Sequence, residues 1–266
     1  MTKDFSKIFS YSKIERFKKC PYAYYLNYLD PEWKGFQKPR DYKTKGSAVH
    51  GAITLFYYLP LEERSFEAMK GCLEKAWFSD VEPQKKPPLG KKGGFGSLRE
   101  ERKAYLQSLK MLKNFLAIAE INPPLFYLPT KEIRYSFCDY EEMIQPLERG
   151  FFISGKFDRV DQRKDGTLRV IDFKTGKEKN NTGQLDFYRL LAELNFKRPV
   201  SLVSYYYLQE GKVVDYPAKK SASIEEIKEA ILDDVRAIES TEEFEPRPSR
   251  LCRYCDFEDI CPYAKR

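Results

Sequence analysis

Residues 151–176 read FFISGKFDRVDQRKDGTLRVIDFKTG, two apolar runs joined by a polar turn. Lys164-Asp165-Gly166 suits a three-residue hairpin loop, because the last position of such a loop takes a left-handed conformation that glycine adopts without steric cost. This register is centred on Asp165 and places Asp158 opposite Asp172. The stretch therefore predicts two antiparallel strands with a pair of aspartates facing each other across them.

The facing aspartates create a charge conflict that a bound cation would remove. Like charges opposed on neighbouring strands repel, and the apolar residues around this pair indicate that it is not freely solvated. Lys174 projects from the same face as Asp172, because strand side chains alternate with a period of two. Two carboxylates and the carbonyl of Phe173 suit Mg²⁺ or Mn²⁺, with waters completing the shell. The alternative is a plain salt bridge in which Lys174 neutralises surface aspartates.

Helical periodicity dominates the first half of the chain, and short strand-like runs dominate the second half. We expect helices over residues 11–28, 45–59, 61–78, 98–121, 184–195 and 224–238. We expect strands over residues 132–138, 150–161, 168–174 and 200–208, and a mobile loop over residues 83–97. This order favours an α/β fold in which one mixed sheet is flanked by helices.

The composition is that of a globular chain with excess positive charge. The 266 residues are 42% hydrophobic and carry a formal net charge of +7, which favours a polyanionic partner. No segment approaches the ~20 apolar residues of a membrane span, and the N-terminus is charged, so we expect a soluble, cytoplasmic protein with no membrane partner. A G-x-x-x-x-G-K-[ST] motif is absent, so any ATP-driven motor must be a separate partner.

Four of the six cysteines have the spacing of a metal centre. Cys252, Cys255 and Cys261 form C-x2-C-x5-C, and Cys20 is followed by proline as Cys261 is. A Cys-Pro pair is familiar from iron–sulfur ligation, but four thiolates would also satisfy a structural zinc ion. The two remaining cysteines are expected to be small buried residues: Cys72 and Cys138.

Motifs outside the hairpin complete a family pattern. Gly46-Ser47-Ala48-Val49-His50 reads G-x-x-x-H, and Gln184-x-x-x-Tyr188 places two polar side chains on one helical face. Together with Asp158 in GKFDRV and Asp172-Phe173-Lys174 in VIDFKTG, these residues resemble the PD-(D/E)XK nuclease superfamily in its RecB-like branch. The N-terminal SKIERFKKCPYAYYLNYL, residues 12–29, resembles the opening helix of RecB-like nucleases.

The resemblance implies a restriction-endonuclease-like core within a single nuclease domain over residues 1–266. A helical insertion would occupy residues 55–130, and the catalytic sheet residues 131–216. Cys20 and residues 250–266 would form a staple. The one-plus-three cysteine arrangement is similar to iron–sulfur RecB-like nucleases, including AddB-type helicase–nuclease proteins and CRISPR-associated spacer-acquisition nucleases. It implies a 4Fe-4S cluster at the four cysteines, with zinc as the alternative.

The resemblance also implies the role of each site residue. His50, Asp158, Asp172 and the carbonyl of Phe173 would hold the catalytic Mg²⁺ or Mn²⁺. Lys174 would position the attacking water. Gln184 and Tyr188 would support the site from their helix.

The implied function is a metal-dependent DNA nuclease. We expect an exonuclease acting on single-stranded DNA or DNA ends, in DNA repair, recombination, or phage or CRISPR DNA processing, with a helicase or an integrase as a possible partner. The alternatives are a CRISPR spacer-processing factor that works with an integrase, and a non-catalytic DNA-binding scaffold that holds zinc.

Cations concentrate in and after the loop at residues 83–97. We expect them to bind DNA phosphates, with Phe95 or the tyrosines stacking on unpaired bases. A solvated insertion is the alternative. The cations are Lys85, Lys86, Lys91, Lys92, Arg99, Arg102 and Lys103.

Overall fold

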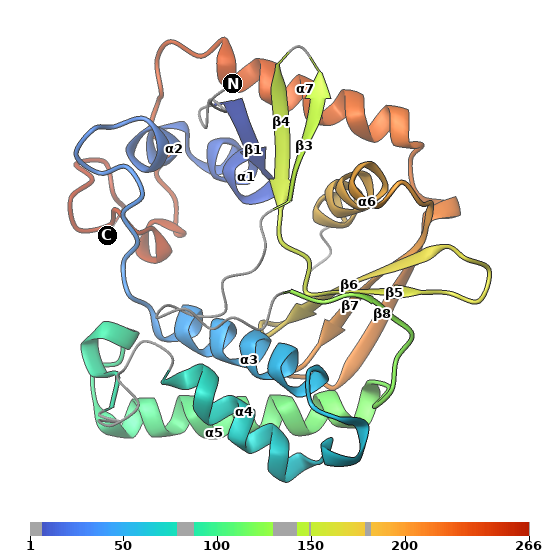
Figure 1. Ribbon diagram of the computed structural model, residues 1–266. Helices are drawn as coiled ribbons and strands as arrows, with labels where there is room; N and C mark the ends of the chain where they lie inside the picture. The colour runs from blue at the N-terminus through green and yellow to red at the C-terminus, as the bar shows by residue number, and fades with distance from the viewer. Residues whose placement is uncertain (1–6, 79–87, 130–142, 149, 179–181, 266) are drawn as a thin grey trace. The chain divides into compact units, whose positions relative to one another are not determined.

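The chain forms two compact units, each assembled from segments that are far apart in the sequence. The computed structural model describes residues 7–78, 88–129, 143–148, 150–178 and 182–265 (Figure 1). The first unit takes its described residues from 1–38, 143–155 and 223–266. The second unit takes them from 39–142 and 156–222.

A mixed five-stranded sheet forms the centre of the second unit, in the order β2-β5-β6-β7-β8. The strands are β2 (Leu125–Tyr127), β5 (Arg159–Gln162), β6 (Leu168–Lys174), β7 (Val200–Tyr207) and β8 (Lys212–Pro217). β6 pairs antiparallel with β5 and parallel with β7. Its sequence LRVIDFK is largely buried, as expected of a central strand covered on both faces.

The predicted hairpin register is confirmed. Arg159 pairs with Ile171 and Val160 with Val170, which is the register centred on the turn. Gly166 has a φ of 81°, so the last loop position is left-handed as predicted. The chemistry of a three-residue turn therefore sets which side chains of β5 and β6 face each other.

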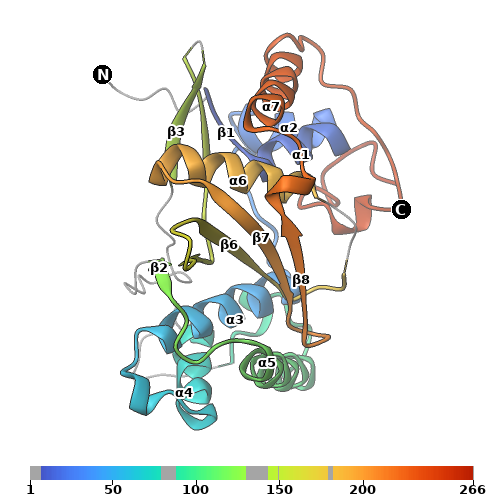
Figure 2. The same cartoon turned by 90° about the vertical axis from the view of Figure 1, so that its right-hand side faces the viewer.

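Helices cover both faces of this sheet (Figure 2). One face carries α3 (Asp41–Tyr57), α4 (Phe66–Trp77) and α5 (Leu98–Ile118), and the other carries α6 (Gly183–Phe196). The core between the sheet and the three helices includes Phe173 from β6 and Phe115 from α5, both buried. Three short 3-10 helices lie in the connections: η2 (Leu61–Glu63), η3 (Gly90–Gly93) and η4 (Ala218–Lys220).

The described part of the loop before α5 is anchored to the helical layer. The buried carboxylate of Glu101 accepts hydrogen bonds from the backbone amides of Leu89 and Gly90, each at 2.9 Å. Phe95 is 2% exposed, and its ring stacks on that of Trp77. The expectation that Phe95 stacks on bases is therefore wrong, because its ring is part of the protein core.

The first unit combines three helices with a small sheet. The helices are α1 (Tyr11–Lys19), α2 (Pro21–Tyr28) and α7 (Ile224–Glu239), followed by the 3-10 helix η5 (Cys252–Tyr254). The sheet has the order β1-β4-β3, with strands β1 (Ile8–Ser10), β4 (Phe151–Gly155) and β3 (Met143–Glu148). In the described part of the chain, no helix is both long and apolar enough to cross a membrane.

The predicted α/β class is confirmed, but the strands divide into two sheets. The apolar run at 150–161 breaks after Gly155, so that β4 belongs to one sheet and β5 to the other. The helix expected over 11–28 is interrupted at Cys20, because Pro21 forces the preceding residue into an extended conformation. The strand expected over 132–138 lies outside the described residues.

One buried arginine joins the sheet to α3. Arg159 is 1% exposed, and it donates hydrogen bonds to Asp161 at 2.9 Å and to the hydroxyl of Tyr57 at 2.6 Å. Its guanidinium also lies 5.1 Å from the ring centre of Tyr57 and 5.7 Å from that of Tyr206. Burial raises the pKa of Asp161, although Arg159 opposes this shift. Burying these two charges costs solvation free energy, and each charge is tolerated in the core because the other one offsets it.

We predict that Arg159→Met lowers the free energy of unfolding by about 3–5 kcal/mol, because it removes the guanidinium paired with the buried Asp161 and leaves only the weaker influence of Arg169. The double variant Arg159→Met/Asp161→Val should recover much of this loss. Urea denaturation of the metal-free protein measures both. The exposed Arg163→Met, at the tip of the same hairpin, should change stability by less than about 0.5 kcal/mol. A double variant no more stable than Arg159→Met would contradict the electrostatic explanation.

Candidate active site

The six side chains predicted as catalytic all lie in the second unit and are linked by a chain of contacts. His50 comes from α3, Asp158 from the residue before β5, Asp172 and Lys174 from β6, and Gln184 and Tyr188 from α6. The site therefore forms where the two helical layers meet the central strand.

Asp158 uses both carboxylate oxygens to join β6 to α3. Oδ2 accepts a hydrogen bond from the backbone amide of Phe173 at 2.8 Å. Oδ1 lies 2.7 Å from Nδ1 of His50. A carboxylate can only accept in such a pair, so Nδ1 carries the proton and Nε2 is the ring nitrogen that could reach a ligand.

Lys174 is held between β6, β7 and α6. Its ammonium lies 2.7 Å from Oδ2 of Asp172 and donates to Oε1 of Gln184 at 2.7 Å. It also lies 4.8 Å from the ring centre of Tyr205, at a distance suited to a cation–π contact. Gln184 in turn donates from Nε2 to the hydroxyl of Tyr188 at 3.2 Å. These contacts fix the direction in which the ammonium points.

The site shifts the pKa values of two of its members. Burial raises the pKa of Asp172 from 3.8 to about 6, with Lys174 opposing the shift and Asp158 adding to it. Burial alone would lower the pKa of His50, but the adjacent Asp158 carboxylate reverses this and the pKa is raised. Both shifts show negative charge concentrated in a poorly solvated place.

The donor chemistry of this site fits a hard divalent cation. Oδ2 of Asp172 is buried and lies 2.7 Å from the ammonium of Lys174. Carboxylate oxygens of this kind are the ligands that Mg²⁺ and Mn²⁺ prefer. As the side chains stand, however, no group of three or more His, Cys, Asp or Glu residues among those described is arranged to hold a metal ion. The carboxylates are instead engaged with His50, Lys174 and the backbone.

Tyr205 is a site neighbour that the sequence analysis missed. It lies opposite Asp172 in the parallel pairing of β6 with β7. The tyrosine-rich end of β7 is visible in the sequence, but the parallel register is not, because no tight turn connects these two strands.

The four cysteines of the predicted metal centre all lie in the first unit. Cys20, Cys255 and Cys261 pack against the same small apolar cluster around Phe257. Burial raises the pKa of Cys261, and the nearby thiols of Cys20 and Cys252 raise it further. Backbone amides of two residues between α7 and η5 donate to sulfur: Arg247 to Cys20 at 3.4 Å and Ser249 to Cys252 at 3.3 Å.

These thiols are near one another without reaching metal-ligand positions in the structure as it stands. The remaining cysteines differ. Cys72 is buried in α4 and packs in the core of the second unit, as expected. Cys138 lies outside the described residues.

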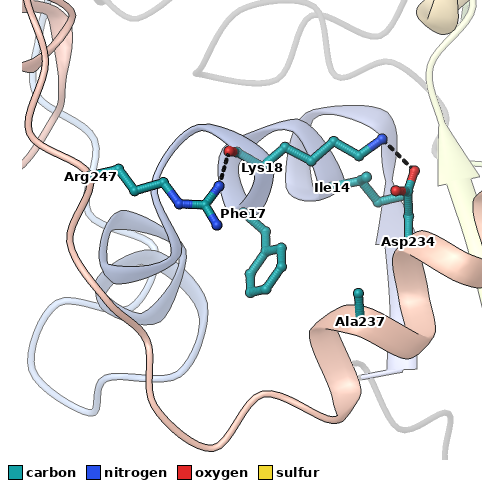
Figure 3. Close-up of a pocket in the computed structure, with 6 residues that line it drawn as sticks. All are labelled: Ile14, Phe17, Lys18, Asp234, Ala237 and Arg247. Atoms are coloured by element: carbon teal, nitrogen blue, oxygen red, sulfur yellow. Dashed lines mark hydrogen bonds and ion pairs between the residues drawn. The ribbon is translucent and has the colours of Figure 1, made fainter.

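A hollow of about 260 Å³ in the first unit is unsuited to binding an anion (Figure 3). Its lining includes two cations, and both are already engaged. Lys18 pairs with Asp234 at 2.6 Å, and Arg247 donates to the carbonyl of Lys18 at 2.7 Å. The hollow instead shows how Arg247, next to the sulfur of Cys20, ties the C-terminal segment to α1.

Comparisons with known proteins show the family to which the chain belongs. The family model described as the PD-(D/E)XK nuclease superfamily matches residues 8–262. The Gene 69 protein of Mycobacterium phage D29 is 26% identical over 96% of this chain and 97% of its own length. Its counterpart of the same name in Mycobacterium phage L5 is 22% identical over 99% of each chain.

A bacterial relative shares part of its length with this chain. An ATP-dependent helicase/deoxyribonuclease subunit of Clostridium perfringens (strain SM101 / Type A) is 26% identical over 64% of this chain, which spans 15% of that protein. Among solved structures, the crystal structure of SSO0001 matches 47% of this chain and 60% of its own, at 18% identity with a TM-score of 0.28. That similarity is too low to compare the two folds.

We predict that Asp172→Asn stabilises the metal-free protein at neutral pH. The pKa of Asp172 is higher in the folded state than in the unfolded chain, so its contribution to stability is complete below 3.8 and is lost as the pH rises through about 6. Thermal melts from pH 4 to 8, in the presence of a chelator, measure the difference between variant and wild type. That difference should grow between pH 4 and 7, and a constant difference would contradict the prediction.

Proposed function

The chain belongs to the PD-(D/E)XK nuclease superfamily, and we propose that it is a metal-dependent nuclease that hydrolyses phosphodiester bonds of DNA. The observation that carries this proposal is the linked set of Asp158, Asp172 and Lys174 at the end of one strand pair, with His50 bonded to Asp158. DNA as the substrate is supported by the printed name of the clostridial relative, which describes a deoxyribonuclease, and by the net charge of +7.

The metal would be Mg²⁺ or Mn²⁺, held by Asp158, Asp172, Nε2 of His50 and the carbonyl of Phe173. When bound, the ion would supply Lewis-acid stabilisation of charge on the phosphate and activation of water. The buried carboxylate of Asp172 supports this assignment, because burial raises its pKa to about 6 despite the adjacent Lys174, and a bound cation would stabilise its ionised form further.

Lys174 would orient the attacking water and offset charge developing on the phosphate. Attack of the water oxygen on phosphorus breaks one phosphoester bond; the water gives up a proton and the leaving oxygen takes one. The hydrogen bond from Lys174 to Gln184 holds the ammonium beside Asp172. Tyr188 accepts from Gln184 and so fixes the amide that Lys174 depends on. We assign Gln184 and Tyr188 positioning roles for that reason.

The proposed activity is that of an exonuclease on single-stranded DNA or DNA ends, in repair, recombination, or phage or CRISPR DNA processing. A helicase or an integrase is the proposed partner, and the cytoplasm the proposed location. The phage and helicase-associated relatives support these settings. We also propose that both units form one nuclease domain, because the family match at 8–262 includes segments of each.

Lys174→Ala should reduce metal-dependent DNA cleavage by at least about 100-fold, because it removes the charge that stabilises the reacting phosphate. Lys177→Ala is the matched control, since Lys177 is exposed and carries the same charge three residues further along. Cleavage of end-labelled single-stranded and duplex DNA, and of closed circular DNA, is measured with Mg²⁺, Mn²⁺ or a chelator. Degradation of linear DNA with sparing of circles is expected. Equal rates for the two variants, or no cleavage by wild type, would refute the proposal.

We propose further that Cys20, Cys252, Cys255 and Cys261 bind a 4Fe-4S cluster that closes the first unit. Three of the four thiols pack against the same apolar cluster in the first unit, which supports a common ligand. Backbone amides also donate to the sulfurs of Cys20 and Cys252, and such donors stabilise sulfur that carries negative charge. A structural zinc ion is the alternative. Cys20 and Cys252 are on segments at opposite ends of the chain, so the group would act as a staple.

Anaerobically purified Cys20→Ala should lose iron and acid-labile sulfide and melt at a lower temperature than wild type. Cys72→Ala provides the control, because Cys72 is a buried thiol of the second unit outside the cluster. It should keep its full iron content. Zinc in place of iron in wild type would favour the alternative, and an unchanged melting temperature in Cys20→Ala would exclude a staple.

A further inference from the structure

The outward face of α5 carries a stripe of exposed side chains, four of which are cations. Residues at positions 99, 103, 106 and 110 follow the i, i+4, i+7, i+11 spacing of one helical face. They line a shallow hollow of about 470 Å³ on the second unit. The α5 stripe consists of Arg99, Arg102, Lys103, Leu106, Gln107 and Lys110.

The charges of the α5 stripe are not neutralised within the described parts of the chain. Its four cations are exposed, and no described carboxylate forms an ion pair with them. The two acidic residues of the first turn are occupied elsewhere. Glu101 is buried and holds the preceding loop, and Glu100 accepts from the backbone amide of Gly96 at 2.8 Å. The stripe therefore presents net positive charge to solvent.

The stripe is connected to the candidate active site through α3. Gln107 accepts a hydrogen bond from Lys45 of α3 at 3.0 Å. The next residue, Gly46, lies against the end of β6, where a Cβ would stand 3.4 Å from the hydroxyl of Thr175. Thr175 follows Lys174 directly. Through Lys45 and Gly46, α3 therefore links the α5 stripe to the end of β6 that carries Lys174, all within one unit.

We propose that the α5 stripe binds the phosphate backbone of the DNA strand engaged at the active site. The stripe is about 16 Å long at 1.5 Å per residue, which corresponds to roughly five nucleotides at 3.4 Å each. Leu106, 55% exposed between the cations, offers an apolar contact to a sugar or a base. This inference rests on the proposed function, and it assigns phosphate binding to the helix itself, since the loop positions Lys85 and Lys86 lie outside the described residues.

The charge pattern favours DNA over an acidic protein segment. The cations are spaced along one line with a single apolar residue among them, which suits a regularly charged backbone. An amphipathic acidic helix would need a broad apolar strip to pack against. The stripe offers only Leu106 for that purpose.

The test compares two variants that remove the same charge. Lys103→Gln/Lys110→Gln removes two of the four positive charges of the α5 stripe and keeps good helix formers. Arg163→Gln/Lys164→Gln removes two exposed charges from the tip of the β5–β6 hairpin in the same unit. Each is combined with Lys174→Ala to suppress cutting, and affinity for labelled DNA of about 30 nucleotides, single-stranded or duplex, is measured in Mg²⁺ against salt concentration.

The stripe variant should bind DNA roughly tenfold more weakly, and its salt slope should fall by about 1.4 to 1.8, or 0.7 to 0.9 per lost phosphate contact. The hairpin variant should keep the affinity and slope of its parent. Equal affinity of the two variants, or weaker binding with an unchanged slope, would overturn the inference. If the double variant melts early, Lys110→Gln alone is measured, with a slope change half as large. A different outcome would refute the proposed function itself. In that outcome the Lys174→Ala parent does not bind DNA and the wild-type protein does not cut it.

Discussion

The site depends on one carboxylate that two parts of the fold share. Asp158 accepts from the backbone of Phe173 on β6 and meets His50 on α3. The next residue, Arg159, holds Tyr57, which lies two helical turns after His50 on the same helix. Two consecutive residues therefore attach α3 to the sheet at two points, and the position of His50 over the strand end follows from both.

Buried charge makes this arrangement costly for the protein without a cation. Asp172 is 6% exposed, and its pKa of about 6 means that the ionised form is poorly stabilised by Lys174 alone. A structure selected only for stability would place an apolar residue here, because a buried ion pair rarely repays the loss of solvation. The largely buried central strand β6 carries the carboxylate of Asp172 and the ammonium of Lys174 at one end, which is the local inconsistency expected of a functional site.

Local chemistry made the hairpin and its register predictable, whereas the partition of strands was not. The turn at Gly166 fixed the pairing of β5 with β6 over a few residues, and helical spacing placed Gln184 beside Tyr188 on α6. The separation of β4 from β5 depends on which distant segment pairs with each, and β1 is a strand of three residues with no periodicity to detect. Tyr205 reaches the site through a parallel register that only the assembled sheet defines.

The first unit, which contains the cysteines, and the candidate site in the second unit are separated by only a few residues of the chain. The first unit is made of three segments, and its middle segment ends with β4 at Gly155. Three residues later the chain supplies Asp158, the first carboxylate of the site. The chain therefore passes from the first unit to the candidate site within three residues, which span about 10 Å when fully extended. The proposed staple at the cysteines would fix the fold of the first unit, up to Gly155, whereas the candidate site residues all belong to the second unit.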